Sequence, residues 1–299
     1  MAGYKTSDNN RVEEAKSFPT HIMNGWHAAL QLDYQRKAER TDVVHLHNGP
    51  LRVLKSLYPE GPEICHTVLV HPPSGLVGGD RIDIRLTVNP QAHALVTTPG
   101  ATRFYRTEKG LASQEVVAKI HQNARLEWLP LETIAYNNCQ GLNKVCFDID
   151  AGGELIAWDI TALGLPTATL PFEQGQLQQH MEIKNIWLER GLIDAKDQRL
   201  MSGLLGLANH RCTSTLIFAT GTDMSRPKRD LALSLARGVL SNDPNGVFAG
   251  ATSPHPRVVV IRALSPLVEP TQTLFRAVWA AWRTGMWEIK NTPPRIWSM

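Results

Sequence analysis

YPEGPEICHTVLVHPPSGLVGGDRIDIRLTVNPQAHALVTTPGATRFYR, residues 58–106, is the stretch that decides the fold. Short runs of β-branched and aliphatic residues at 67–70, 82–88 and 94–97 alternate in it with turns rich in proline and glycine. Such runs are typical of strands, and proline and glycine mark the bends between them. The stretch therefore predicts consecutive short strands joined by tight turns.

The longest of these turns, HPPSGLVGGD at 71–80, contains two prolines and three glycines. Proline fixes φ and glycine tolerates positive φ, so this segment is suited to a defined path longer than a plain hairpin. A second turn has Pro99 followed by Gly100, the order of a type II turn. It places Arg103 and Arg106 just beyond the bend.

The same rhythm extends in both directions from this stretch. Alternating apolar residues predict a strand over 26–34, and β-rich runs recur to 263. Helical spacing appears late, at 230–240 with Asp230 as the expected N-cap and from Pro270 onward, where Leu274 begins an apolar stripe. Residues 200–207 allow a short helix that two glycines weaken. The chain is therefore mainly β, with two or three helices toward the C-terminus.

Periodicity leaves three β architectures open, namely a sandwich, a barrel and a solenoid. Residues 1–23 are polar and charged, and we expect them to form a flexible N-terminal tail. The length allows one large domain or two, because β-rich single domains often exceed 200 residues, and residues 24–299 are expected to form a single domain.

Composition narrows the functional class. The 299 residues have a formal net charge of +3 and no block of lysine and arginine, so no nucleic-acid partner is expected. The four cysteines form no C-x-x-C pair, which favours reduced thiols over a zinc ribbon or a disulfide framework. Runs of about 20 apolar residues are absent, and we expect a cytoplasmic protein with no membrane contact.

Sequence motifs of catalysis are also absent. The glycine-rich turn at 74–80 lacks the Lys-Ser/Thr pair of a P-loop, and no G-x-S-x-G or H-E-x-x-H occurs. We therefore expect no catalytic residues and no tightly bound cofactor. A hydrolase site assembled from distant residues remains an alternative that pattern reasoning leaves open.

Three side chains are candidate metal ligands. His71 and Asp80 bracket the long turn, and an imidazole with a carboxylate suits a borderline divalent ion such as Ni²⁺. Glu132 follows Pro130, and its carboxylate needs water, a cation or a basic partner. The alternative for each is structural, with Asp80 holding the turn through backbone N–H groups.

Two further pairs have metal-ligand spacing. His45 and His47 share a face if their segment is a strand, and His210 and Cys212 do the same. Two ligands do not make a tight site, and a solvated polar face accounts equally well for the histidine pair.

Five motifs occur in series along the chain: YPEG at 58–61, HPPSGLVGGD at 71–80, TTPGATRFYR at 97–106, LEWLPLETI at 126–134 and PRIW at 294–297. In this order and spacing they resemble the urease accessory protein D family, UreD, called UreH in some organisms. The resemblance runs from Trp26 to Trp297. The chain departs from the family pattern at four positions, which are Ser74, Arg103, Leu131 and Leu165.

The resemblance implies a fold and a function. Its fold is an irregular, β-helix-like stack of many short strands with helices at the C-terminal side. Its function is a non-catalytic one, in which the protein binds apo-urease, recruits an F-type accessory protein and through it a G-type GTPase, and helps Ni²⁺ reach the urease active site. Transient Ni²⁺ passage through the protein, lined by His71, Asp80 and Glu132, belongs to this expectation, and a nickel store is the alternative.

The C-terminal segment is rich in tryptophan and arginine, which are enriched at protein interfaces. We expect this segment to dock the F-type partner. The residues assigned to that interface are Trp279, Trp282, Arg283, Trp287, Arg295 and Trp297.

Overall fold

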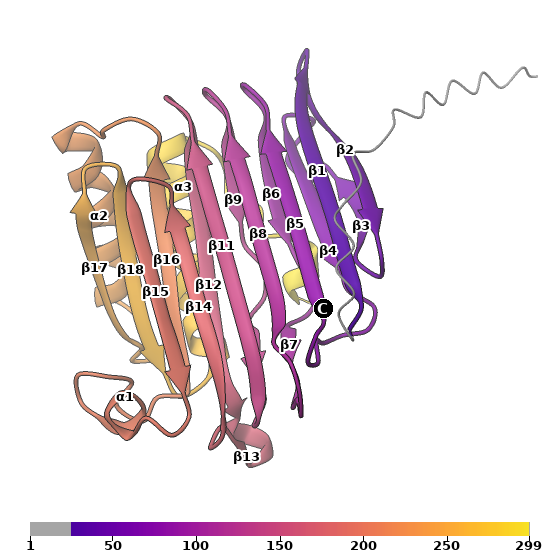
Figure 1. The fold of residues 1–299 in the computed structure, drawn as a ribbon. Coiled ribbons are helices and arrows are strands. Elements are labelled where there is room, and N and C mark those ends of the chain that lie inside the picture. The colour runs from indigo at the N-terminus through magenta and orange to yellow at the C-terminus, as the bar shows by residue number, and fades with distance from the viewer. Residues whose placement is uncertain (1–24, 299) are drawn as a thin grey trace, which may run out of the picture.

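The computed structural model describes residues 25–298. The expected tail, residues 1–23, lies outside the described residues. Two β-sheets lie face to face (Figure 1), and we call them sheet A and sheet B. Sheet A has seven strands in the order β15-β14-β11-β8-β5-β1-β2. Their bounds are β1 His27–Lys37, β2 Arg40–Asn48, β5 Arg81–Val88, β8 Ala112–Ile120, β11 Cys139–Ile149, β14 Gly175–Ile183 and β15 Trp187–Asp194.

Sheet B follows the order β17-β18-β16-β12-β9-β6-β4-β3, with β7, β10 and β13 attached beside this path. The bounds of the main strands are β3 Arg52–Leu57, β4 Ile64–Val70, β6 His93–Thr97, β9 Arg125–Trp128, β12 Glu154–Leu165, β16 Cys212–Thr220, β17 Phe248–His255 and β18 Val258–Ser265. The attached strands are β7 Thr102–Phe104, β10 Thr133–Ala135 and β13 Leu170–Pro171.

The central strands form a solenoid-like stack, as the family resemblance implies. The main strands β4, β5, β6, β8, β9, β11, β12 and β14 lie alternately in sheet B and sheet A. From β6 onward, each of these main strands pairs in parallel with the preceding main strand of its own sheet. Each crossing therefore advances the chain by one strand position. Antiparallel pairs flank this stack, with β2 on β1 at one end of sheet A and β15 on β14 at the other.

The glycine-rich turn at 71–80 carries the chain from β4 in sheet B to β5 in sheet A. Gly79 has φ +90°, and a Cβ on Gly78 would lie 1.8 Å from the carbonyl oxygen of Lys109, so neither position accepts a side chain without strain. The buried Asp80 carboxylate accepts hydrogen bonds from the backbone N–H of Val77 at 2.8 Å and of Trp26 at 3.2 Å. Asp80 thereby holds the turn.

Two apolar cores follow from strand alternation. In β12, Leu155, Ala157 and Leu163 point into the core between the sheets. Their neighbours Ile156 and Trp158 point the other way, into a second core under the helices. The largely buried β12 thus contributes side chains to both cores.

Three α-helices occur in the described residues, all after β15: α1 Gln198–Ser202, α2 Arg226–Ser241 and α3 Val268–Trp287. Short 3₁₀ turns occupy Pro166–Ala168 and Arg295–Ser298. The mainly β class, the stacked strands and the late helices are all confirmed. No helix in residues 25–298 is long and apolar enough to cross a membrane.

The expected N-cap of α2 is wrong. The helix begins one turn earlier, with Ser225 as N-cap, because the Ser225 hydroxyl accepts from the backbone N–H of Lys228 and Pro227 fits the first turn. Asp230 instead forms an exposed ion pair with Arg226 at 3.6 Å.

Candidate functional site

Polar side chains interrupt the core between the sheets along one line. In sheet A, Gln114 of β8, Asn143 of β11 and Gln179 of β14 stand at inward positions, and the parallel register sets them directly beside one another. We call these three residues the amide row. Apolar inward neighbours flank each of them, such as Val116 next to Gln114.

Sheet B presents a matching row of threonines. Register pairs Thr102 of β7 with Thr133 of β10, Thr133 with Thr161 of β12, and Thr161 with Thr213 of β16. We call these four residues the threonine row, and the two rows together with Asp159 the polar track. Because each row crosses its strands at one level, the track runs perpendicular to the strands.

Hydrogen bonds join the two rows. Gln114 Nε2 donates to Asn143 Oδ1 at 3.2 Å, and Asn143 Nδ2 donates to Asp159 Oδ2 at 2.7 Å. Gln179 Nε2 donates to Thr161 Oγ1 at 2.6 Å, and the Thr161 hydroxyl donates to Asp159 Oδ1 at 2.9 Å. Asp159 therefore sits where the rows meet, held by neutral amide and hydroxyl donors.

Asp159 is the charged group of the track. Burial raises its pKa to about 6, the Glu189 carboxylate adds to this shift, and the bond from Thr161 opposes it. At neutral pH the group is an anion in a poorly solvated place, and the donors that surround it carry no charge. Such a carboxylate attracts a cation.

Cavities lie at both ends of the track. One of about 150 Å³ is lined by His71, Thr102 and Gln114, among others. The other, of about 190 Å³, is lined by Asp159, Gln179 and Thr213 to Thr215. Asn143 of the amide row, and Thr133 and Thr161 of the threonine row, lie between the residues that line the first cavity and those that line the second. The polar track thus extends from one cavity to the other as a line of buried and half-buried polar side chains.

Comparison with known proteins decides the family. The family model described as UreD urease accessory protein matches residues 27–298. A protein of Paracidovorax citrulli named urease accessory protein UreD is 55% identical over 274 residues, covering 92% of this chain and 99% of that protein. Proteins of the same name from Albidiferax ferrireducens and Methylibium petroleiphilum are 54% and 42% identical, each over 99% of its length.

The chain belongs to the UreD family. The resemblance drawn from five short motifs is thereby confirmed over nearly the whole chain. UreD proteins are accessory proteins of urease, so membership gives this chain a role in urease maturation.

The UreD chain places His71 at the mouth of the first cavity. Its ring packs on Trp26 with centroids 4.8 Å apart, and its buried Nε2 has no hydrogen-bond partner within residues 25–298. Burial lowers the pKa of His71, which keeps the imidazole neutral and its lone pair available. This is the one expected metal ligand whose surroundings suit a passing cation.

The other two expected ligands have structural partners. Asp80 holds its turn through backbone bonds, and Glu132 accepts from Gln272 Nε2 of α3 at 2.8 Å. Among the described residues, His71, Asp80 and Glu132 do not converge on a common point as a metal cluster does. Their assignment to a nickel path stays a prediction, with His71 its best-placed member.

Neither of the spaced pairs forms a site in the described part of the chain. His45 and His47 are exposed on β2, as expected for a solvated face. Cys212 is buried, and its thiol contacts Ser214 and Thr271. His210 is engaged with the carbonyl of Leu207 at 3.0 Å.

The C-terminal segment of this UreD protein corrects the expected docking surface. Trp279, Trp282, Arg283 and Trp287 are buried, because the apolar stripe of α3 faces sheet B. From these positions they cannot contact a partner. Trp297 is also held down, with its ring 5.4 Å from that of Trp158 and its Nε1 donating to Thr97 at 2.9 Å. Arg295 alone of the six expected residues is exposed.

Removing the chain after Gly285 is therefore expected to destabilise the whole protein. The deletion takes away Trp287, which is buried against Phe218, and Trp297, which packs against Trp158. Loss of one buried and one half-buried tryptophan costs about 4 kcal/mol or more. Soluble yield and thermal unfolding would report this, and a truncated chain that unfolds at the wild-type temperature would contradict it.

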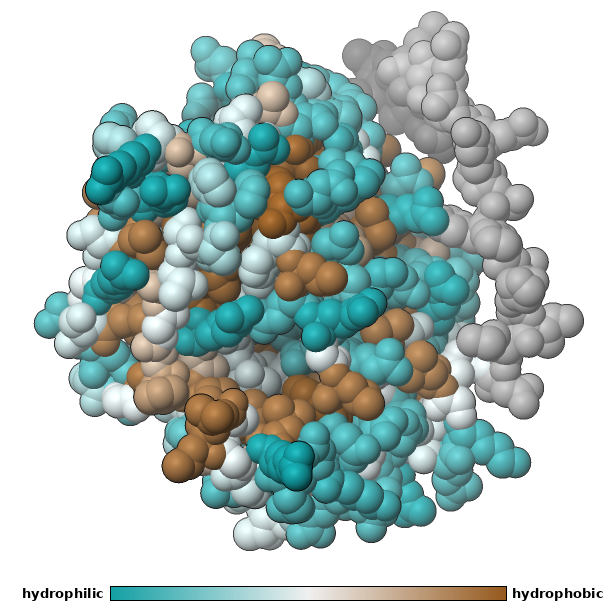
Figure 2. Space-filling view, turned by 60° about the vertical axis from the view of Figure 1, so that its left-hand side comes forward, coloured by the Kyte–Doolittle hydropathy of each residue, from teal (hydrophilic) through white to brown (hydrophobic). Residues whose placement is uncertain are grey.

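Pattern reasoning missed an exposed apolar surface near the second cavity. Leu204 and Leu205, in the turn after α1, are 92% and 106% exposed, and Phe248 at the start of β17 is 73% exposed. Figure 2 shows hydrophobic side chains exposed on this side of the molecule. A hollow of about 400 Å³ is lined by Phe248, by Gly206, which follows the two leucines, and by Thr213 to Thr215. Sequence offers no signal for this exposure, because leucine is normally assigned to the core.

Proposed function

We propose that this chain is a non-catalytic urease maturation factor. It binds apo-urease and, together with F- and G-type accessory proteins, enables the GTP-dependent insertion of Ni²⁺ into the urease active site. Membership of the UreD family supports the role in maturation. The sequence lacks a P-loop, so GTP hydrolysis falls to the G-type partner.

The proposed route of Ni²⁺ is the polar track. The observation that supports this route is Asp159, a half-buried carboxylate held by neutral donors and placed where the amide row meets the threonine row. Amide and hydroxyl oxygens can replace part of the hydration shell of the ion, as carbonyl oxygens do in ion channels. One carboxylate among neutral groups binds a divalent ion weakly enough to release it.

The cavities at the two ends of the polar track, which we call its first and second mouths, have ligands of different kinds. At the first, His71 offers a neutral imidazole nitrogen, a ligand that Ni²⁺ accepts readily. At the second, Glu189 lies beside Thr215 at 3.1 Å and Arg262 at 2.9 Å. The ion pair with Arg262 weakens the attraction of Glu189 for a cation, which favours release at that end.

The exposed apolar surface at the second mouth is the proposed docking site of the F-type protein. A partner that hands over or receives Ni²⁺ must cover a mouth of the track to keep the ion from bulk water. Phe248 lines the hollow beside that mouth, and the exposed Leu204 and Leu205 directly precede Gly206, another of its lining residues. Exposed apolar patches of this kind are typical of protein contacts. Apo-urease is then left to cover the first mouth.

Replacing Leu204 and Leu205 together with serine is expected to abolish co-purification with the F-type protein while apo-urease is still bound. Both side chains are exposed, so the fold should be unaffected. Leu54→Ser is a matched control, since Leu54 is 64% exposed on β3, at the other end of sheet B. Loss of urease in place of the F-type protein would contradict this docking.

The role in maturation has a simpler test. Cells that lack this chain, grown at ordinary nickel supply, should make urease with little or no nickel, and supplying the chain should restore it. Nickel per urease subunit is measured by atomic absorption on purified enzyme. Fully loaded urease in the absence of the chain would overturn the proposed function.

A further inference from the structure

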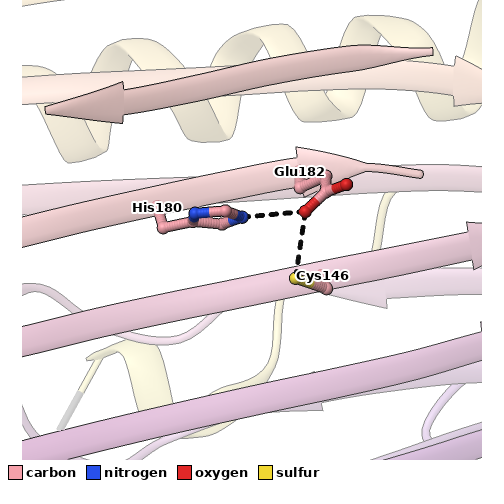
Figure 3. Close-up of side chains that lie close together, drawn as sticks. All are labelled: Cys146, His180 and Glu182. Carbon is pink, nitrogen blue, oxygen red and sulfur yellow. Dashed lines mark hydrogen bonds and ion pairs between the residues drawn. The ribbon is translucent and has the colours of Figure 1, made fainter. Parts of the chain in front are cut away.

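A thiol, an imidazole and a carboxylate meet on the outer face of sheet A (Figure 3). His180 and Glu182 are two apart on β14 and so share a face, and the parallel register sets Cys146 of β11 beside Glu182. His180 Nε2 lies 2.8 Å from Glu182 Oε2, and the Cys146 thiol lies 3.5 Å from the same oxygen. The three ligand atoms all lie within 4.8 Å of one another.

We propose that Cys146, His180 and Glu182 form a binding site for a borderline divalent transition-metal ion such as Ni²⁺ or Zn²⁺. Sulfur, nitrogen and oxygen donors together suit such ions, whereas Mg²⁺ and Ca²⁺ prefer oxygen alone. A tetrahedral ion of this class, with bonds of about 2.0–2.3 Å, needs donors about 3.5 Å apart. The observed separations, 2.8 Å and 3.5 Å with none above 4.8 Å, bracket this value.

The site is open on one side. All three side chains are partly exposed, so water or a ligand from another molecule completes the coordination. Three protein ligands with an open position are the arrangement of exchangeable metal sites, whereas closed structural sites use four. The remaining cysteines are buried elsewhere, at Cys65, Cys139 and Cys212.

A cysteine hydrolase triad is the competing reading of the same three residues, and the geometry disfavours it. A catalytic imidazole must bond to the thiol to take its proton. Here the Glu182 carboxylate oxygen lies between the thiol and the imidazole and contacts both.

This site is separate from the polar track. Asn143 and Gln179 point into the core, while Cys146, His180 and Glu182 point out of the same two strands to the other face of sheet A. Lys144, which borders the site, is held by Glu115 at 3.2 Å. The inference therefore does not depend on the proposed function and can hold or fail independently of it.

Titration of the full chain with Co²⁺ tests the site, because a cobalt-bound thiolate gives a charge-transfer absorption band. The wild type should show this band with one equivalent of Co²⁺, and Ni²⁺ or Zn²⁺ should abolish it while excess Mg²⁺ should not. Cys146→Ser should remove the band, and His180→Gln or Glu182→Gln should each weaken affinity by about tenfold or more. His47→Gln, at an exposed histidine on β2, is the matched control and should change nothing.

A band that persists in Cys146→Ser, or equal Co²⁺ affinity in the wild type and all three variants, would overturn the proposal. A second measurement needs no substitution at all. Ni²⁺ should slow alkylation of Cys146 in the wild-type chain, read by mass spectrometry of the labelled peptide, and Mg²⁺ should not. Equal alkylation rates with and without Ni²⁺ would overturn the proposal even if the variants failed to fold.

Discussion

Replacing Arg283 with methionine is expected to lower the free energy of unfolding by about 3 to 5 kcal/mol. Arg283 is 0% exposed, and its Nη2 donates to both carboxylate oxygens of Glu60 at 2.9 and 3.0 Å. Its Nε lies 3.6 Å from Glu127 Oε2. Methionine fills a similar space but carries no charge. The substitution therefore leaves the carboxylates of Glu60 and Glu127 buried without their arginine partner.

The carboxylates of Glu60 and Glu127 make the stability of this cluster sensitive to substitution and to pH, because each also contacts a buried histidine. Glu60 lies 2.7 Å from His66, and Glu127 lies 2.7 Å from His93. Through Arg283 the cluster fastens α3 to the YPEG turn and to β9. Acid should also loosen it, because the pKa of Glu127 is lowered: burial opposes ionisation, but His93 and Arg283 outweigh it. That contribution is present above the usual carboxyl pKa and is lost as pH falls through the lowered value.

Urea unfolding followed by circular dichroism measures the effect of Arg283→Met. Arg295→Met is the control, since Arg295 is exposed and should shift stability by about 0.5 kcal/mol or less. Adding Glu60→Gln to Arg283→Met should restore part of the lost stability, since one of the two carboxylates left without Arg283 is then replaced by a neutral amide. An Arg283 variant as stable as the Arg295 variant would show that the cluster does not fasten α3.

Replacing Asp159 with asparagine is expected to stabilise the protein at neutral pH by about 1 to 2 kcal/mol. Burial raises the pKa of Asp159 from 3.8 to about 6, a shift worth about 3 kcal/mol, and the amide forfeits about one hydrogen bond in return. A raised carboxyl pKa favours folding fully below the unfolded value and loses that contribution as pH rises through the folded one. The gain of Asp159→Asn should therefore grow from about pH 4 to about pH 6 and then level off.

Urea unfolding of the wild type and Asp159→Asn across this pH range checks the prediction. Asp230→Asn is the control, because Asp230 is exposed on α2 and should show no such pH dependence. A natural residue that lowers stability at neutral pH is typical of a functional site. A stability difference between wild type and Asp159→Asn that is the same at every pH would show that folding does not disfavour the ionised form of Asp159.

Local pattern was enough to predict many short strands and late helices, whereas their stacking was implied only by the family resemblance. The turn at 71–80 and the apolar stripe of α3 each depend on residues close together in sequence. The same stripe misled the partner prediction, because tryptophan and arginine are common both at interfaces and in buried anchors. Arg283 has its partners at Glu60 and Glu127, more than a hundred residues away, so its burial is invisible to composition.

The polar track left a faint signal in the sequence. Gln114, Asn143 and Gln179 each break an alternating apolar face, which marks them as inward polar residues. Only the parallel register shows that they form one row. The cluster of Cys146, His180 and Glu182 could likewise be predicted only in part. The spacing of His180 and Glu182 puts them on one face of a strand, but only the pairing of β11 with β14 brings Cys146 beside them.

The nickel content of urease matured with Asp159→Asn tests the polar track most directly. The variant should be folded and should still co-purify with apo-urease and the F-type protein, because Asp159 lies between the sheets. With that complex intact, we expect urease activated with the variant to hold at most about a tenth of the nickel obtained with the wild type or with Asp230→Asn, which corresponds to about 1.4 kcal/mol at the limiting step. Urease fully loaded with nickel by the Asp159→Asn complex would contradict passage of the ion between the sheets.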